Sequence, residues 1–117
     1  MSTYTYTIPG TSNKFPCFPG LYLLSGLTDG NTHIPYPIFK SMSDFDNIAS
    51  LDNTADVLLI MPGYRVILYS GANYSGQIID TSNNSTSLTV VDIANNNVAT
   101  SVKLYYGSTA NGWTEIT

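Results

Sequence analysis

The fold is decided by one stretch of the sequence, Pro62-Gly63-Tyr64-Arg65-Val66-Ile67-Leu68-Tyr69-Ser70-Gly71-Ala72-Asn73-Tyr74-Ser75-Gly76. It begins with Pro-Gly, a dipeptide that marks turns. The residues that follow, 64–69, are mostly aliphatic and aromatic, as is typical of a strand. Gly76 can take a positive φ that other residues resist, so a tight hairpin can close there. The stretch therefore predicts a turn, a strand and a hairpin.

Strand signals of this kind continue outward along the chain, and no long segment carries an apolar stripe of helical period. Pro35 and Pro37 place one strand at a sheet edge or a bulge. Short strands with turn residues between them predict an all-β sandwich or barrel. The strands are expected at residues 4–8, 21–24, 34–40, 57–61, 64–69, 77–80, 87–91 and 102–106.

The chain also repeats itself at the start of two units. Pro19-Gly20 precedes an apolar run and then Ser25-Gly26, just as the quoted stretch runs from Pro-Gly through an apolar strand to Ser70-Gly71. Each unit then reaches a second glycine, which is Gly30 in the first unit and Gly76 in the second.

Two related hexapeptides extend the repeat. Asp46–Leu51 and Asn96–Ser101 lie 50 positions apart (46 to 96) and agree in residue type at five of six positions. Because the Pro-Gly strands and the hexapeptides recur in the same order, the sequence predicts two consecutive four-strand units.

These residues carry a resemblance to a known family. The segment from Tyr69 to Gly76 resembles the aromatic, six residues, glycine signature of a βγ-crystallin Greek key. In that motif the aromatic ring packs over the hairpin as a corner, and a downstream serine ties the bend; Ser85 and Thr86 are the candidates here. The resemblance covers about residues 19 to 106. It implies an all-β fold in which two Greek-key motifs form a βγ-crystallin-like β-sandwich.

The hexapeptides resemble the calcium signature of the same family, which is Asn/Asp, Asn/Asp, two free positions, Ser/Thr and Ser. Asn96–Ser101 fits this pattern in full, and Asp46–Leu51 departs from it at Leu51. The first motif is also degenerate in its hairpin, because Leu24 stands at the aromatic position and the spacing to Gly30 is one residue short.

We therefore expect one βγ-crystallin-like domain over residues 1–117. The first Greek key, which is degenerate, occupies residues 19–61, and the second occupies residues 62–108. An N-terminal extension or strand precedes them at 1–18, and a C-terminal tail follows at 109–117.

The resemblance implies two Ca²⁺ sites, each shared between the two motifs. Calcium takes about six to eight oxygen ligands and tolerates irregular geometry. The first motif would contribute Ser25 (carbonyl), Asp46, Asn47, Ile48 (carbonyl) and Ser50, and its partners from the second motif would be Ser70 (carbonyl), Asn96, Asn97, Val98 (carbonyl) and Thr100. In the family, the carbonyl of the third hexapeptide position in one motif and the hydroxyl of the fifth position in the other belong to the same site. Four further residues would maintain the motifs themselves: Tyr69, Gly76, Gly30 and Ser101.

The resemblance gives a non-enzymatic calcium-binding domain with a structural, stress-related or calcium-stabilised role. Asp46 is the only carboxylate in the two hexapeptides, so the expected affinity is modest, because calcium affinity rises with ligand charge. Two alternatives stay open. Asn-rich segments also form ordinary turns, and small crystallin-like domains also resemble inhibitors, toxins and adhesion modules that bind proteins or carbohydrates.

Composition narrows the function classes. The net charge is −4 with four basic residues, which argues against nucleic acid and against an anionic membrane surface as partners. His33 and Cys17 are the only residues of their types, so we expect a loop residue and a packed thiol. No acid–base or nucleophile constellation indicates an enzyme, and no catalytic residue is assigned.

The beginning of the chain lacks a basic region followed by an apolar run, which leads to the expectation of a cytoplasmic location. A second copy of the chain, pairing through an edge strand such as residues 4–8, and a protein or sugar partner both stay open.

Overall fold

The computed structural model describes residues 4–7, 12, 14–17, 20–25, 34–45, 55–92 and 99–117. The regular elements within these residues are ten strands. None of the described residues forms a helix that is long and apolar enough to cross a membrane. The strands are β1 (Tyr4–Thr7), β2 (Lys14–Cys17), β3 (Leu21–Ser25), β4 (Ile34–Ile38), β5 (Ala55–Ile60), β6 (Tyr64–Gly71), β7 (Ser75–Asn83), β8 (Thr89–Asp92), β9 (Ser101–Ser108) and β10 (Gly112–Glu115).

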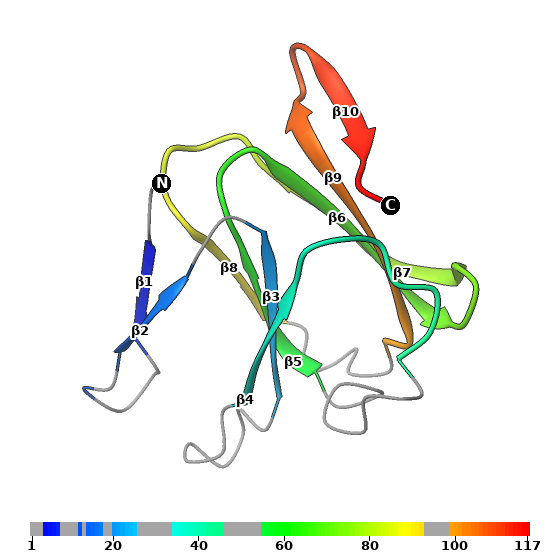
Figure 1. The fold of residues 1–117 in the computed structure, drawn as a ribbon, viewed down its shortest axis with the longest axis horizontal. Helices are drawn as coiled ribbons and strands as arrows, with labels where there is room; N and C mark the ends of the chain where they lie inside the picture. Colours follow the sequence, from blue (N-terminus) through cyan, green and yellow to red (C-terminus); the bar gives the residue numbers. More distant parts are fainter. Residues whose placement is uncertain are drawn as a thin grey trace.

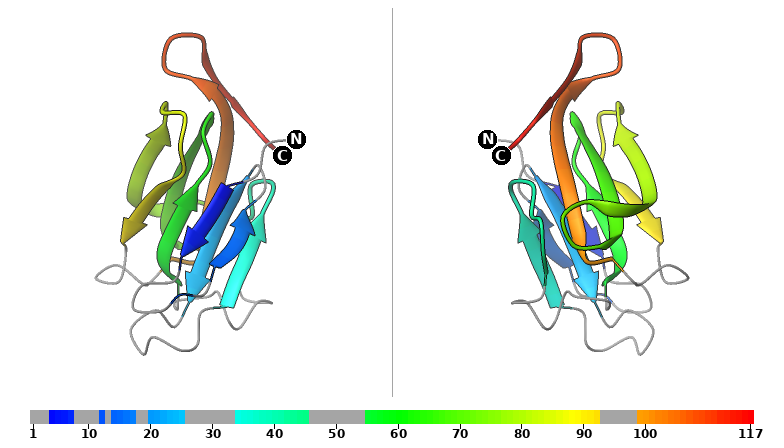
Figure 2. Two further views of the ribbon diagram at one scale, coloured as in Figure 1. Left: turned by 90° about the vertical axis from the view of Figure 1, so that its left-hand side faces the viewer. Right: turned by 90° about the vertical axis from the view of Figure 1, so that its right-hand side faces the viewer.

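The strands form two four-stranded antiparallel sheets and one separate hairpin (Figure 1). One sheet has the order β4-β3-β5-β8, the other has the order β10-β9-β6-β7, and β1 pairs only with β2. The side views in Figure 2 show that the two sheets lie face to face. The predicted all-β sandwich is therefore confirmed.

Each of the expected strands coincides with an observed one, and β4 lies at a sheet edge, as Pro35 and Pro37 predicted. Two further strands had weak sequence signals. Pro16 lies inside β2, and a proline argues against a strand except at an edge, which a two-stranded pair provides. β10 is short, begins with a glycine and falls within residues 109–117, which the sequence suggested as a tail.

The core lies between the sheets. Leu58 and Ile60 of β5 face Val66 and Leu68 of β6, because side chains two residues apart in a strand point to the same face. The same buried cluster includes Ile38, Phe45, Ala99, Val102 and Leu104.

Two segments connect the units by crossing between the sheets. β8 follows β7 in the chain but pairs with β5 in the opposite sheet, with Val57 opposite Asp92. In the other direction, residues 39–45 follow β4 and reach β9, where Met42 and Val102 exchange two backbone hydrogen bonds of 2.9 and 3.0 Å. Each unit therefore supplies a segment to the sheet of the other, as in two intertwined Greek keys.

Phe45 anchors the segment 39–45, because its side chain is 0% exposed. We expect Phe45→Ala to lower the free energy of unfolding by about 3–5 kcal/mol, through lost burial and the cavity left behind. Chemical denaturation measures this value. Phe39→Ala is the matched control, since Phe39 lies on the same segment and is 57% exposed; its effect should stay below about 1 kcal/mol. Equal losses for the two variants would contradict this account of the core.

Candidate functional site

The structure describes the strands and the hairpin that surround the predicted calcium sites, which we call the frame, but only part of the predicted ligands. Asp46, Asn47, Ile48, Ser50, Asn96, Asn97, Val98 and Gly30 lie outside the described residues. Tyr69, Ser70, Gly76, Thr100 and Ser101 lie within them, and for Ser25 the backbone is described. Ser25 ends β3, where it pairs with Ile34 on one side and Ala55 on the other.

The frame lies at one end of the sandwich. Four strand ends gather in the lower part of Figure 1: the ends of β3 and β8 and the beginnings of β5 and β9. The two side views in Figure 2 show the same arrangement. The first hexapeptide follows Phe45 directly, and the second ends with Thr100 and Ser101 at the start of β9.

The hairpin between β6 and β7 has the conformation that its glycine predicted. Gly76 has a φ of 71°, and the turn residues Asn73 and Tyr74 have φ values of 56° and 60°. The Ser70 hydroxyl donates to the carbonyl of Gly76 at 3.2 Å. The positive φ favours glycine, and a Cβ at position 76 would displace the Ser70 hydroxyl.

The aromatic corner is also present. Tyr69 is 9% exposed, and its ring packs edge-to-face on the ring of Tyr74 with centroids 5.7 Å apart. Of the two candidates for the downstream serine, Ser85 ties the bend after β7. Its Oγ lies 2.6 Å from Oδ1 of the buried Asn83 and 2.9 Å from the carbonyl of Ser87.

Ser101 ties the hairpin to β9. Its buried hydroxyl donates to the carbonyl of Gly71 at 2.6 Å and accepts from the amide of Tyr74 at 3.2 Å. The amide of Thr100 donates to the carbonyl of Tyr69 at 2.8 Å. The last two residues of the second hexapeptide are therefore bonded to both sides of Ser70, whose carbonyl is a predicted ligand.

Two further hydrogen bonds connect the first unit to the β6–β7 hairpin and to the start of β9. The amide of Phe45 donates to the carbonyl of Thr100 at 2.8 Å, and the amide of Asn73 donates to the carbonyl of Ser43 at 2.8 Å. Ser43 and Phe45 were not among the residues predicted from the sequence. Their backbone contacts carry no local signal, although an apolar aromatic residue immediately before Asp46 indicates a buried anchor there.

The donors in this region suit a hard cation. The described part of the frame offers hydroxyl and carbonyl oxygens, and the described residues contain no group of three or more His, Cys, Asp or Glu that could hold a metal ion. Oxygens of these kinds are ligands that calcium takes in irregular arrangements. Of the proposed side-chain ligands, Thr100 lies within the part of the chain that the structure describes.

The outer face of the β10-β9-β6-β7 sheet carries tyrosines that are covered by cations. Arg65 forms a bidentate ion pair with Asp80 (2.9 and 2.6 Å), and its guanidinium lies 5.4 Å from the ring centre of Tyr105. Lys103 Nζ lies 4.8 Å from the ring centre of Tyr74. The hydrogen bond from Arg65 lowers the pKa of Asp80, and burial raises the pKa of Tyr105.

Comparisons with known proteins bear on the fold. No family model matches the sequence, and no curated protein matches it. A solved structure from work on the evolution of the eye-lens βγ-crystallin domain fold is similar, with a TM-score of 0.62 and 14% sequence identity. The match covers 92% of this chain and 100% of that chain. The chain therefore has the βγ-crystallin domain fold, as the sequence resemblance implied.

We expect Gly76→Ala to lower the free energy of unfolding by about 1–2 kcal/mol or more, because alanine resists the positive φ and its Cβ displaces the Ser70 hydroxyl. Thermal or chemical denaturation measures the loss. In a Ser70→Ala background the overlap disappears while the φ cost remains, so Gly76→Ala should cost less there. The same cost in both backgrounds would show that the overlap has no part in it.

Proposed function

We propose that this βγ-crystallin-fold domain binds two calcium ions at the end of the sandwich where its two hexapeptides are anchored, and that calcium stabilises the native state. The observation that carries the proposal is the hydrogen bond between the amide of Phe45 and the carbonyl of Thr100. It joins the residue before the first hexapeptide to the fifth residue of the second.

The frame supports ligands shared between the two units. The hydrogen bond from Asn73 to Ser43 fixes the hairpin of the second unit against the chain that leads into the first hexapeptide. The Ser101 hydroxyl holds the same hairpin against the end of the second hexapeptide. Because these contacts are formed by the fold itself, a bound ion would have less chain to order, which favours binding.

The proposed ligands also set the expected strength and role. Asp46 is the only carboxylate among both hexapeptides, so dissociation constants in the micromolar to millimolar range are expected. An ion that binds only the folded state stabilises it by about 2.7 kcal/mol per site at a hundredfold excess over its dissociation constant. Calcium would then act as a structural element of the domain, and the proposal assigns it no catalytic step.

A crystallin-fold module that binds a protein or a sugar without calcium makes the opposite prediction about calcium. Among the described residues, the tyrosine rings of the outer sheet face give it little support. Arg65 lies over Tyr105 and Lys103 lies over Tyr74, so cations occupy ring faces on which a sugar would stack.

Calorimetric titration of chelator-treated protein with CaCl₂ should show saturable binding near two ions per chain, and calcium should raise the melting temperature. The physical reason is that the ions bind the native state and not the unfolded chain. The absence of both heat and a melting shift at millimolar calcium would overturn the proposal. Magnesium is the control cation, because its demand for regular octahedral geometry suits these ligands less well.

The variant Thr100→Val keeps the size of the side chain and removes its hydroxyl, a proposed calcium ligand. We expect it to weaken one of the two binding events by about tenfold or more, the order of effect of losing one charge-assisted contact. Thr109→Val is the matched control, since Thr109 is exposed in the turn between β9 and β10. Melting in chelator separates lost binding from lost stability. Unchanged calcium affinity in Thr100→Val would contradict the shared sites.

A further inference from the structure

The turn between β9 and β10 contains Asn111-Gly112, the only Asn-Gly pair in the sequence. Residues 109–111 connect the two strands, and both Asn111 and Gly112 are exposed. Figure 1 shows this hairpin projecting from the sandwich at the end opposite the frame of the proposed calcium sites. None of residues 106–114 carries a charge, so a carboxylate formed at the tip would be a new feature of this surface.

An asparagine side chain is open to attack by the backbone nitrogen of the residue that follows it. That nitrogen forms a bond to Cγ, the bond from Cγ to Nδ2 breaks, and ammonia leaves with the proton of the attacking nitrogen. A five-membered succinimide ring results, and water opens it at either of its two carbonyls. The products are aspartate and isoaspartate. The reaction consumes only water, and a following glycine favours it because no side chain hinders the attack.

The other three asparagines of the described residues are held against this attack. Asn83 is 2% exposed, and its carboxamide is hydrogen-bonded through both its nitrogen and its oxygen. Asn73 precedes Tyr74, whose amide donates to a side chain of β9 at 3.2 Å. Asn84 precedes Ser85, whose amide donates to the carboxamide oxygen of Asn83 at 2.9 Å. At each position the attacking nitrogen or the carboxamide is already bonded.

Asn111 lacks these restraints. Its backbone amide donates to the Ser108 hydroxyl at 3.0 Å, but its carboxamide has no hydrogen-bond partner among the described residues. A Cβ at Gly112 would meet no atom within 4 Å, so the space beside this residue is open. Gly112 also forms, with Ser108, the last pair of the β9–β10 ladder, where local opening costs least. The attacking nitrogen is therefore accessible at Asn111.

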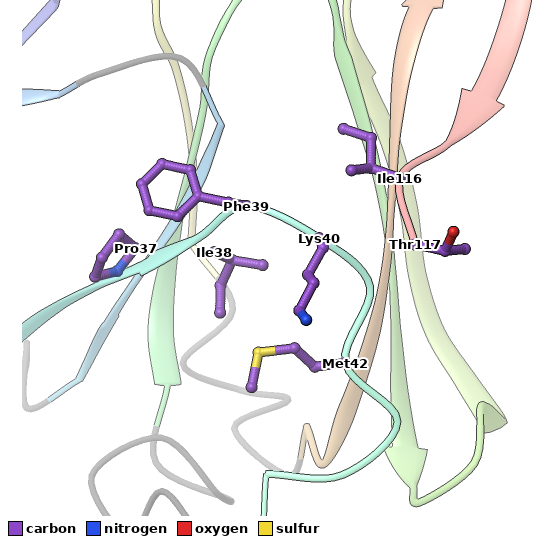
Figure 3. A pocket seen from close by; sticks show the side chains of 7 residues that line it. All are labelled: Pro37, Ile38, Phe39, Lys40, Met42, Ile116 and Thr117. Carbon is purple, nitrogen blue, oxygen red and sulfur yellow. The ribbon is translucent and has the colours of Figure 1, made fainter.

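The far end of β10 is anchored to the rest of the fold. The hydroxyl of Ser41 donates to Glu115 and its amide donates to the carbonyl of Ile116, both at 2.8 Å. Ile116 also lines the cavity drawn in Figure 3. The tip is tied more loosely, through the amide of Thr109 and Oδ1 of Asn84 on an exposed loop (3.1 Å). A change at the tip should therefore act on the hairpin before it affects the sandwich.

We propose that Asn111 is a site of spontaneous modification, at which the amide is converted through a succinimide to aspartate and isoaspartate. Either product adds a negative charge to the tip. Isoaspartate also lengthens the main chain by one atom and so displaces Gly112 from its pairing with Ser108. The register leaves little room for this, because the carbonyl of Gly112 lies so close to Gly107 that a Cβ there would overlap it. Isoaspartate should therefore loosen β10. The site does not depend on calcium binding.

Incubation of the full chain in mildly alkaline buffer, followed by peptide mapping with mass spectrometry, tests the proposal. Trypsin cuts after Lys103 and releases residues 104–117, in which Asn111 is the only asparagine. This peptide should gain the mass of one amide-to-acid conversion before any peptide with Asn73, Asn83 or Asn84 does. It should separate into two products, one of which is a substrate for enzymatic methylation of isoaspartate. The rate should rise with pH, because the attacking nitrogen must lose its proton.

An unchanged 104–117 peptide, or earlier conversion of Asn73, Asn83 or Asn84, would overturn the proposal. Asn111→Gln is the matched control, since its longer side chain must close a six-membered ring, which is slower, and its peptide should stay unchanged over the same period. Asn111→Asp carries the charge without the longer main chain. In hydrogen exchange, the isoaspartate form should therefore lose protection at residues 112–116 while Asn111→Asp keeps it. Equal protection in both would contradict the loosening of β10.

Discussion

The structure depends on the passage of residues 39–45 from one sheet to the other. This segment makes backbone hydrogen bonds at Ser41, Met42, Ser43 and Phe45, and their partners lie on β9, on the chain beside it and in the β6–β7 hairpin. The buried ring of Phe45 then fills the space between the sheets. Because β8 crosses in the opposite direction to pair with β5, neither unit has a complete sheet of its own. The two repeats therefore fold as one domain.

The edge of β9 explains why a cavity lies beside this segment. Residues 105–108 of β9 pair with β10, while farther along the strand Val102 pairs with Met42. Ser41 links the two elements that pair with β9 on this side. Its hydroxyl accepts from the amide of Leu104 on β9, and its amide donates to the carbonyl of Ile116, which follows β10. Met42 lies on one of these two elements and Ile116 on the chain that continues the other, and both residues line the cavity between them.

Much of the fold could be predicted from the sequence because its signals are local. The Pro62-Gly63 turn, the apolar run after it and the glycine at 76 each reflect the conformation of a few neighbouring residues, and the structure has them as predicted. The candidate site was predictable only in part. Ser101 and Thr100 were found through their motif, but Ser43 and Phe45 act through backbone groups that any residue carries, and their partners lie about 30 to 55 positions away. β10 escaped prediction for a similar reason, since its pairing with β9 compensates for a weak intrinsic preference.

The low content of charged residues has a structural counterpart. Only 10% of the residues are charged, and Asn, Ser and Thr are abundant. Several of these side chains are buried or partly buried and connect separate segments of the chain. Asn83, 2% exposed, donates to the carbonyls of Ile60 and Ser87, and its Oδ1 accepts from the amide of Ser85. Ser41 and Ser101 each join two segments through one hydroxyl. A neutral amide or hydroxyl satisfies buried backbone groups without the large desolvation cost of a charge. A domain held in this way has few fixed carboxylates to offer a cation, which is why carbonyl and hydroxyl oxygens would have to form most of any calcium site in it.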